Sequence, residues 1–160
     1  MRYGRASLKR APTRGAGVRD AAIISVGYDT LCRSSELAAI TVAHLELMKD
    51  GTGRVPIPRT KADLVGEGRI AYLAPETTRL VARWLDEAKI THGALFRALH
   101  LQRVAEGPLS TSSIRRLIKR ATDRAGLGPI VKGDLSGHSM RIGAAQDMMV
   151  AGVDSLAIMQ

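Results

Sequence analysis

Apolar side chains recur every three or four residues along much of the chain, which is the spacing of an α-helix with one buried face. This period predicts helices over residues 18–31, 34–40, 77–88, 112–125, 136–152 and 155–160. Within residues 77–88 the buried stripe consists of Leu80, Val81, Trp84 and Leu85. We therefore place Trp84 in the core rather than on a surface that stacks against a base.

Between the second and third predicted helices the hydrophobic period shortens to two, as expected for half-buried strands. The predicted strands are residues 44–49, 54–58 and 69–73. Pro56 and Pro58 make the second strand irregular, and we expect them to confine it to an edge of the sheet. The pattern predicts a small antiparallel meander of three strands. The apolar residues 94–96 precede an expected polar loop up to Pro108.

The chain divides into a leader and one domain. Residues 1–17 are rich in Arg, Lys, Gly and Pro and match neither period. Such a segment is a solvated tail or an arm that contacts a polyanion, and its composition favours neither. A chain of 160 residues suits one hydrophobic core, so we place a single domain at residues 18–160.

The formal net charge is +9, from 24 Lys and Arg against 15 Asp and Glu, which favours a polyanionic partner such as nucleic acid. The predicted helix 112–125 carries a basic face made of Arg115, Arg116, Lys119, Arg120 and Arg124. We interpret this face as one that follows a phosphate backbone, in preference to a plain solvated face.

Several classes of protein are disfavoured. A single cysteine, Cys32, excludes an internal disulfide and a cysteine-rich metal site. No apolar run reaches the roughly 18 residues that span a bilayer, and the first residues show no signal-peptide pattern. We therefore expect an intracellular protein without a membrane partner.

A candidate anion site lies at the start of the helix predicted over residues 136–152. Ser136 can cap this helix, and Gly152 can end it in a left-handed conformation. His138 and Arg141 are three residues apart, so they project from one face near the free backbone amides of the first turn. An imidazole, a guanidinium and a helix N-terminus suit a phosphate.

The spacing of that pair proves little by itself. A second His-x-x-Arg pair, His100 and Arg103, occurs in the predicted loop. A structural hydrogen bond is the simpler explanation for either pair without further context.

Two further basic residues stand at local breaks in the pattern. Arg33 lies at the junction of two apolar helices, where it is either paired with Glu36 or held for an anionic ligand. Lys61 lies near the tip of the predicted hairpin, where a lysine most often only solubilises a sheet edge.

Together these segments resemble the tyrosine recombinases, a family that includes phage integrases. The similar stretches are TLCRSSELAAI at 30–40, RTK at 59–61, SGHSMRIGAA at 136–145, VAGV at 150–153 and IMQ at 158–160. They occur in the family's order and cover nearly all of residues 18–160. The resemblance implies a mostly helical α+β catalytic domain with a small three-stranded antiparallel sheet.

The resemblance also implies a role for each candidate residue. Arg33 and Arg141 would hold the non-bridging oxygens of the scissile phosphate, where planar guanidinium groups stabilise the growing charge. His138 would join them as a hydrogen-bond donor or proton carrier, and Lys61 would protonate the leaving 5′-oxygen. Glu36 would support Arg33. Arg59 would contact DNA together with the basic helix, and the family's chemistry needs no metal and no cofactor.

The chain departs from the family at both ends. The family's nucleophilic tyrosine, and the His or Trp before it, would lie beyond Gln160. The family's N-terminal helical DNA-binding domain has no counterpart either. The existing tyrosines, Tyr3, Tyr28 and Tyr72, match no nucleophile position.

We therefore expect the catalytic domain of a site-specific DNA recombinase or integrase, without its C-terminal nucleophile segment and inactive alone. The full-length family member would cleave duplex DNA through a 3′-phosphotyrosyl intermediate, as a homotetramer on DNA in the cytoplasm of a bacterium, near the nucleoid. Arg33, His138 and Arg141 should converge on one concave point. One alternative is a non-catalytic DNA-binding module with this fold; another is a basic structural protein, such as a ribosome-associated one, in which Arg33 and Lys61 hardly matter.

We predict that the affinity of the chain for duplex DNA falls steeply with salt, because the basic helix displaces counterions from the phosphates. The logarithm of the association constant, measured by fluorescence anisotropy, should fall by several units per decade of salt concentration. Replacing Arg115 and Arg116 by Ala should make this slope shallower. An affinity that does not change with salt would contradict the prediction.

Overall fold

The computed structural model describes residues 15–57, 68–100, 103–126 and 137–154, with the backbone alone at 137–139. The helices are α2 (Ala16–Thr30), α3 (Ser34–Ala39), the 3-10 turn η1 (Val42–His44), α4 (Pro75–Ala88), α5 (Thr111–Arg124) and α6 (Gly137–Val150). The strands are β1 (Glu46–Leu47), β2 (Gly53–Ile57), β3 (Arg69–Leu73), β4 (Arg97–His100) and β5 (Arg103–Pro108). This is the predicted α+β class, with helices predominating.

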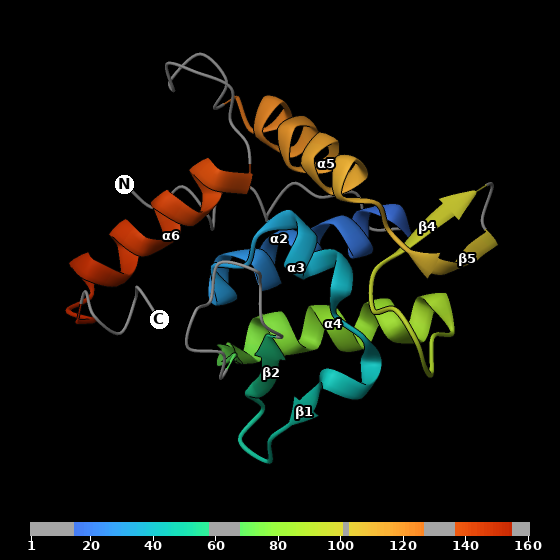
Figure 1. The fold of residues 1–160 in the computed structure, drawn as a ribbon, viewed down its shortest axis with the longest axis horizontal. Coiled ribbons are helices and arrows are strands. Elements are labelled where there is room, and N and C mark those ends of the chain that lie inside the picture. The colour runs from blue at the N-terminus through green and yellow to red at the C-terminus, as the bar shows by residue number, and fades with distance from the viewer. Residues whose placement is uncertain (1–14, 58–67, 101–102, 127–136, 155–160) are drawn as a thin grey trace.

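Helix α2 lies at the centre of the molecule. It packs against α3, α4, α5, α6 and β3, with α4 and α5 on opposite sides of it (Figure 1). Ala22, Ile23 and Val26 are completely buried. Most of the surface of α2 carries apolar or small side chains. Such a helix has no polar face for solvent, so the other elements pack around it.

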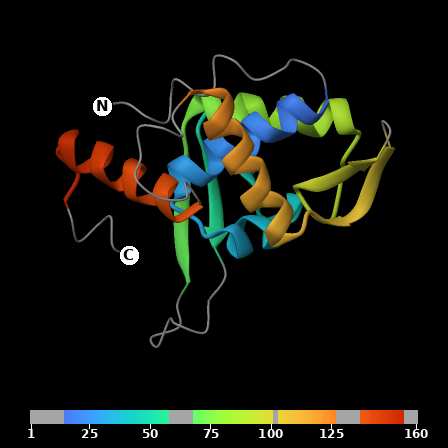
Figure 2. The ribbon, with the colours of Figure 1, turned by 90° about the horizontal axis from the view of Figure 1, so that it is seen from above.

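The two ends of the molecule carry different elements. Helix α6 projects at one end, and the hairpin of β4 and β5 forms the other (Figures 1 and 2). The sequence predicted a polar loop up to Pro108. This prediction was wrong, because the segment pairs as an antiparallel hairpin. Its strands are short and irregular, with a register shift between Arg97 and Leu99, and their burial does not alternate. The two-residue period that identifies a strand is consequently missing.

The predicted three-stranded antiparallel meander is confirmed, with strand order β1-β2-β3. The expected edge position of β2 was wrong, since β2 is the middle strand. The prolines are tolerated for a local reason: β1 pairs with β2 only at Gly53 and Arg54. Pro56 lies past the end of β1, where a missing amide proton leaves no partner unsatisfied. Pro58 lies outside the described residues.

One face of the sheet contributes to the core and the other faces solvent. Val55 and Ile57 of β2 and Ala71 and Leu73 of β3 are buried. Tyr72, on the opposite face, is exposed and lies beside its cross-strand partner Arg54. Successive side chains of β3 therefore alternate between the core and solvent, as strand geometry requires.

The described helix ends carry residues that are suited to begin or end a helix. The Ser110 hydroxyl caps α5 by accepting a hydrogen bond from the Ser113 amide, at 3.2 Å. Gly152 adopts a left-handed conformation, with φ of 85°, directly after α6. Ser136 and the helix predicted over residues 155–160 lie outside the described residues. In the part of the chain that the structure covers, no helix is both long and apolar enough to cross a membrane.

Trp84 has no solvent exposure and its indole Nε1 donates a hydrogen bond to the Leu95 carbonyl oxygen at 2.8 Å. We predict that Trp84→Phe lowers the free energy of unfolding by about 2 kcal/mol, since it leaves a cavity and an unpaired carbonyl. Urea unfolding followed by circular dichroism measures this. Arg79→Ala, on the exposed face of α4, is the control and should change the stability by less than about 0.5 kcal/mol. Equal effects of the two substitutions would show that Trp84 does not hold the core.

Candidate active site

Arg33 lies in the short link between α2 and α3. Leu31 adopts a left-handed conformation, with φ of 54°, and ends α2. Arg33 is extended and precedes α3 directly. The helical backbone is therefore interrupted between α2 and α3. Arg33 lies at this junction and not within either helix.

Glu36 fixes Arg33 through both of its carboxylate oxygens. Oε2 accepts a hydrogen bond from the Arg33 backbone amide at 2.7 Å, and Oε1 accepts one from the guanidinium Nη1 at 3.1 Å. The Glu36 side chain is 9% exposed, whereas that of Arg33 is 50% exposed. One edge of the guanidinium is thus anchored to a buried carboxylate, while much of the group remains accessible to a ligand.

Arg69 on β3 is a second cation at the same carboxylate, and sequence reasoning missed it. Its Nη2 lies 3.9 Å from Glu36 Oε2 and donates to the Cys32 sulfur at 3.7 Å. Burial raises the pKa of the Cys32 thiol above its usual value, against the opposing effects of the Thr30 hydroxyl and the Arg69 charge. The thiol is therefore neutral at physiological pH, and Glu36 is the counterion for both guanidiniums.

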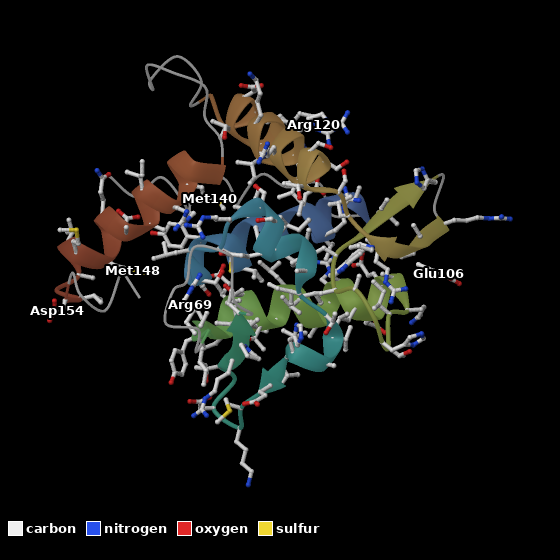
Figure 3. All side chains as sticks on the ribbon, viewed as in Figure 1. Arg69, Glu106, Arg120, Met140, Met148 and Asp154 are labelled. Atoms are coloured by element: carbon white, nitrogen blue, oxygen red, sulfur yellow. The ribbon has the colours of Figure 1, made fainter. Side chains whose placement is uncertain are left out.

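Arg141 comes from α6, which meets the same stretch of α2. A Cβ atom added at Gly27 would lie 2.5 Å from Met140 Cε and 3.2 Å from Leu37 Cδ1. Met140 precedes Arg141, and the Leu37 amide donates to the Arg33 carbonyl at 2.9 Å. Gly27 thus marks a point of α2 at which α3 and the beginning of α6 both pack closely. Figure 3 shows Met140 and Arg69 on the side of the molecule where α6 meets α2.

The Nε atom of Arg141 is buried and has no hydrogen-bond partner among the described residues. A buried donor without a partner is unusual and costs roughly 1–3 kcal/mol. Arg33 and Arg69 contribute two guanidiniums at the one carboxylate of Glu36, and this surplus of positive charge favours an anion.

Three other predicted site residues lie wholly or partly outside the described residues. Lys61 and Arg59 lie outside the described residues, as does the His138 side chain, although the His138 backbone belongs to α6. Convergence of Arg33, His138 and Arg141 on one concave point stays a prediction. His100 and Arg103 are cross-strand partners on the β4–β5 hairpin and are both exposed, so that His-x-x-Arg pair has no helix start beside it.

The basic helix is amphipathic as predicted. Ile114, Leu117 and Ile118 are buried against the core. The exposed residues on its other side include Arg115, Arg116, Lys119, Arg120 and Arg124. Among the described residues, no group of three or more His, Cys, Asp or Glu side chains could hold a metal ion.

This combination of fold and charged side chains has counterparts among known proteins, in both sequence and fold. Residues 6–160 match the model of the phage integrase family. The chain is 32% identical over 169 residues to the recombinase Cre of Escherichia phage P1, covering 96% of this chain and 48% of that protein. It is 31% identical over 153 residues to an integrase/recombinase XerD homologue of Selenomonas ruminantium, covering 91% and 43%.

Solved structures agree with the sequence matches. The XerA recombinase superposes with a TM-score of 0.75 at 22% identity, over 97% of this chain and 50% of that one. The XerH recombinase in a pre-cleavage complex with its difH substrate gives a TM-score of 0.74 at 19% identity, over 98% and 42%. The chain belongs to the phage integrase family, the tyrosine recombinases, and has the fold of their catalytic domains. It spans about half the length of the curated relatives it matches.

We predict that Glu36→Ala lowers the free energy of unfolding by about 2 kcal/mol, because it removes a buried carboxylate that accepts charge-assisted hydrogen bonds. Urea denaturation measures the loss. The matched control is Asp86→Ala, which removes an acid with the same three-residue spacing from its basic partner Lys89, both 81% exposed. That change should cost less than about 0.5 kcal/mol. Equal losses would mean that Glu36 acts as an ordinary surface ion-pair residue.

Proposed function

We propose that this chain is the catalytic domain of a site-specific DNA recombinase or integrase, which binds duplex DNA and holds the scissile phosphate for strand cleavage and rejoining. The observation that carries the proposal is the pair of arginines. Arg33 is half-exposed and anchored by buried Glu36. Arg141 has a buried donor without a partner among the described residues, and its helix packs on the same part of α2. The relative XerH is seen bound to its difH substrate, which supports DNA as the partner.

In the proposed mechanism the protein stabilises charge that develops on phosphorus-bound oxygens. The Arg33 and Arg141 guanidiniums donate to the non-bridging oxygens, and these donors contribute most as the transition state forms. His138 donates to the same phosphate, and Lys61 gives its proton to the leaving 5′-oxygen. Glu36 keeps Arg33 oriented without touching DNA. The exposed basic face of α5, together with Arg59, binds the neighbouring phosphates.

The nucleophile in this proposal is a tyrosine that the 160 residues do not include. Tyr28 is ill-suited, because its hydroxyl already donates to the Asp147 carboxylate. Tyr72 is 63% exposed on the outer face of the sheet, with the Arg54 guanidinium 5.7 Å from its ring centroid. Tyr3 lies outside the described residues. Attack by the missing tyrosine would produce a 3′-phosphotyrosyl bond and release the 5′-hydroxyl.

The wider biological setting belongs to the same proposal. The complete protein would act as a homotetramer on DNA, near the nucleoid of a bacterium. The second candidate function is a non-catalytic DNA-binding module, which the exposed basic face of α5 favours by itself. That module would bind DNA but would not use Arg33 and Arg141 for chemistry.

We predict that the 160-residue chain forms no covalent adduct with a suicide DNA substrate, because neither of the described tyrosines, Tyr28 and Tyr72, is placed for attack. A chain that continues past Gln160 to a tyrosine should form the adduct, which a denaturing gel detects. In that longer chain, Ala at Arg33, Lys61, His138 or Arg141 should abolish or strongly slow it, whereas Arg79→Ala on α4 should not.

The outcomes separate the candidate functions. Binding without an adduct from the longer chain would favour the non-catalytic module. An adduct from the 160-residue chain would show that one of its three tyrosines is the nucleophile.

A further inference from the structure

Two contacts attach α6 to α2. The Tyr28 hydroxyl of α2 donates a hydrogen bond to Asp147 Oδ2 of α6. One residue earlier, Gly27 has no side chain, which leaves room for Met140 of α6. Met140 and Asp147 are two helical turns apart, or roughly 10 Å along the axis of α6. Neighbouring positions of α2 therefore hold α6 at two separated points, which fixes both where α6 lies and how it is rotated.

Arg141 lies inside the segment that these two contacts span. Its Nε atom is buried and has no hydrogen-bond partner within the described part of the chain. Among the described residues, no hydrogen bond of Nε fixes the direction of the guanidinium, so the position of the helix that carries it gains importance. Ala144 is completely buried in the same segment, which lets the helix approach closely.

Several other described side chains of α6 face solvent. Ile142, Met149 and Val150 are exposed, and α2 is the principal neighbour of α6 in the described structure. Loss of one of the two attachment points would allow α6 to turn about the other. The end of a long side chain lies far from the helix axis. Even a modest rotation of α6 therefore displaces it by more than about an ångström.

We propose that Tyr28 and Asp147 are positioning residues that fix the rotation of α6 and thereby aim the Arg141 guanidinium at the phosphate beside Arg33. This inference rests on the proposed function, since it assigns a purpose to the orientation of Arg141. The hydrogen bond joins the Tyr28 hydroxyl of α2 to the Asp147 carboxylate of α6 across 119 residues of sequence. A displacement of about 1 Å at a reacting group can reduce a rate by about a hundredfold.

The first test is a double-mutant cycle on DNA affinity with the 160-residue chain. Tyr28→Phe removes only the hydroxyl and should weaken binding of a duplex by about three- to tenfold, within the usual range of such coupling. In an Arg141→Ala background it should weaken binding no further, because there is no guanidinium left to aim. Combined with Arg120→Ala on the exposed face of α5, its effect should be additive.

Substitutions at Asp147 separate positioning from simple destabilisation. Asp147→Asn keeps a carbonyl oxygen that can accept from Tyr28, so it should retain most of the affinity. Asp147→Leu has similar size without an acceptor, so it should behave like Tyr28→Phe. Unfolding by urea, measured for each variant, identifies any loss of affinity that comes only from unfolded protein.

A second test needs no DNA and stands apart from the proposed function. The Nε–H group of Arg141 should give its own signal in a ¹H–¹⁵N spectrum, assigned by its loss in Arg141→Lys. Tyr28→Phe should shift or broaden this signal, and Asp147→Asn should leave it nearly unchanged. If Arg141→Ala does not weaken DNA binding, the proposed function fails while this spectrum still decides the positioning. An unchanged signal in Tyr28→Phe, or additivity of Tyr28→Phe with Arg141→Ala, would overturn the inference.

Discussion

The burial of α2 is the constraint on which the rest of the structure depends. A helix surrounded by other elements must be free of charges and bulky groups at the points of closest approach, and Gly27 is one such point. As a result, α3, β3 and α6 all pack against the same helix, α2. Groups carried by these elements can then be held in a common frame although they lie far apart in sequence.

The buried Glu36 carboxylate resolves an electrostatic conflict within that frame. Guanidiniums gathered near one point repel each other, and a buried carboxylate would be unstable without cations. Glu36 lies beside Arg33 and Arg69 and satisfies both demands. Because one carboxylate does not neutralise every guanidinium nearby, an incoming phosphate completes the charge balance instead of disturbing it. The same arrangement satisfies the buried carboxylate and leaves net positive charge beside it.

Local patterns revealed most of the elements but few of the contacts between them. The stripe on α4 and the Gly152 terminus depend on neighbours in sequence, so the chain itself predicts them. The β4–β5 hairpin has no regular alternation and was missed. In the site, the pairing of Arg33 with Glu36 follows from their spacing. By contrast, the bond of Arg69 to Cys32 spans 37 residues and that of Tyr28 to Asp147 spans 119, which no local period encodes.

That long separation also bears on the order in which the protein is made. A ribosome completes α2 through α5 well before α6 emerges, and contacts between distant segments are slow to form because a long loop must first close. Arg33 and Arg69 can thus pair with Glu36 before Arg141 has been synthesised. Docking of α6 through the Tyr28 hydroxyl is then a late event in synthesis, so the basic face of α5 is complete before the helix that carries Arg141 is attached.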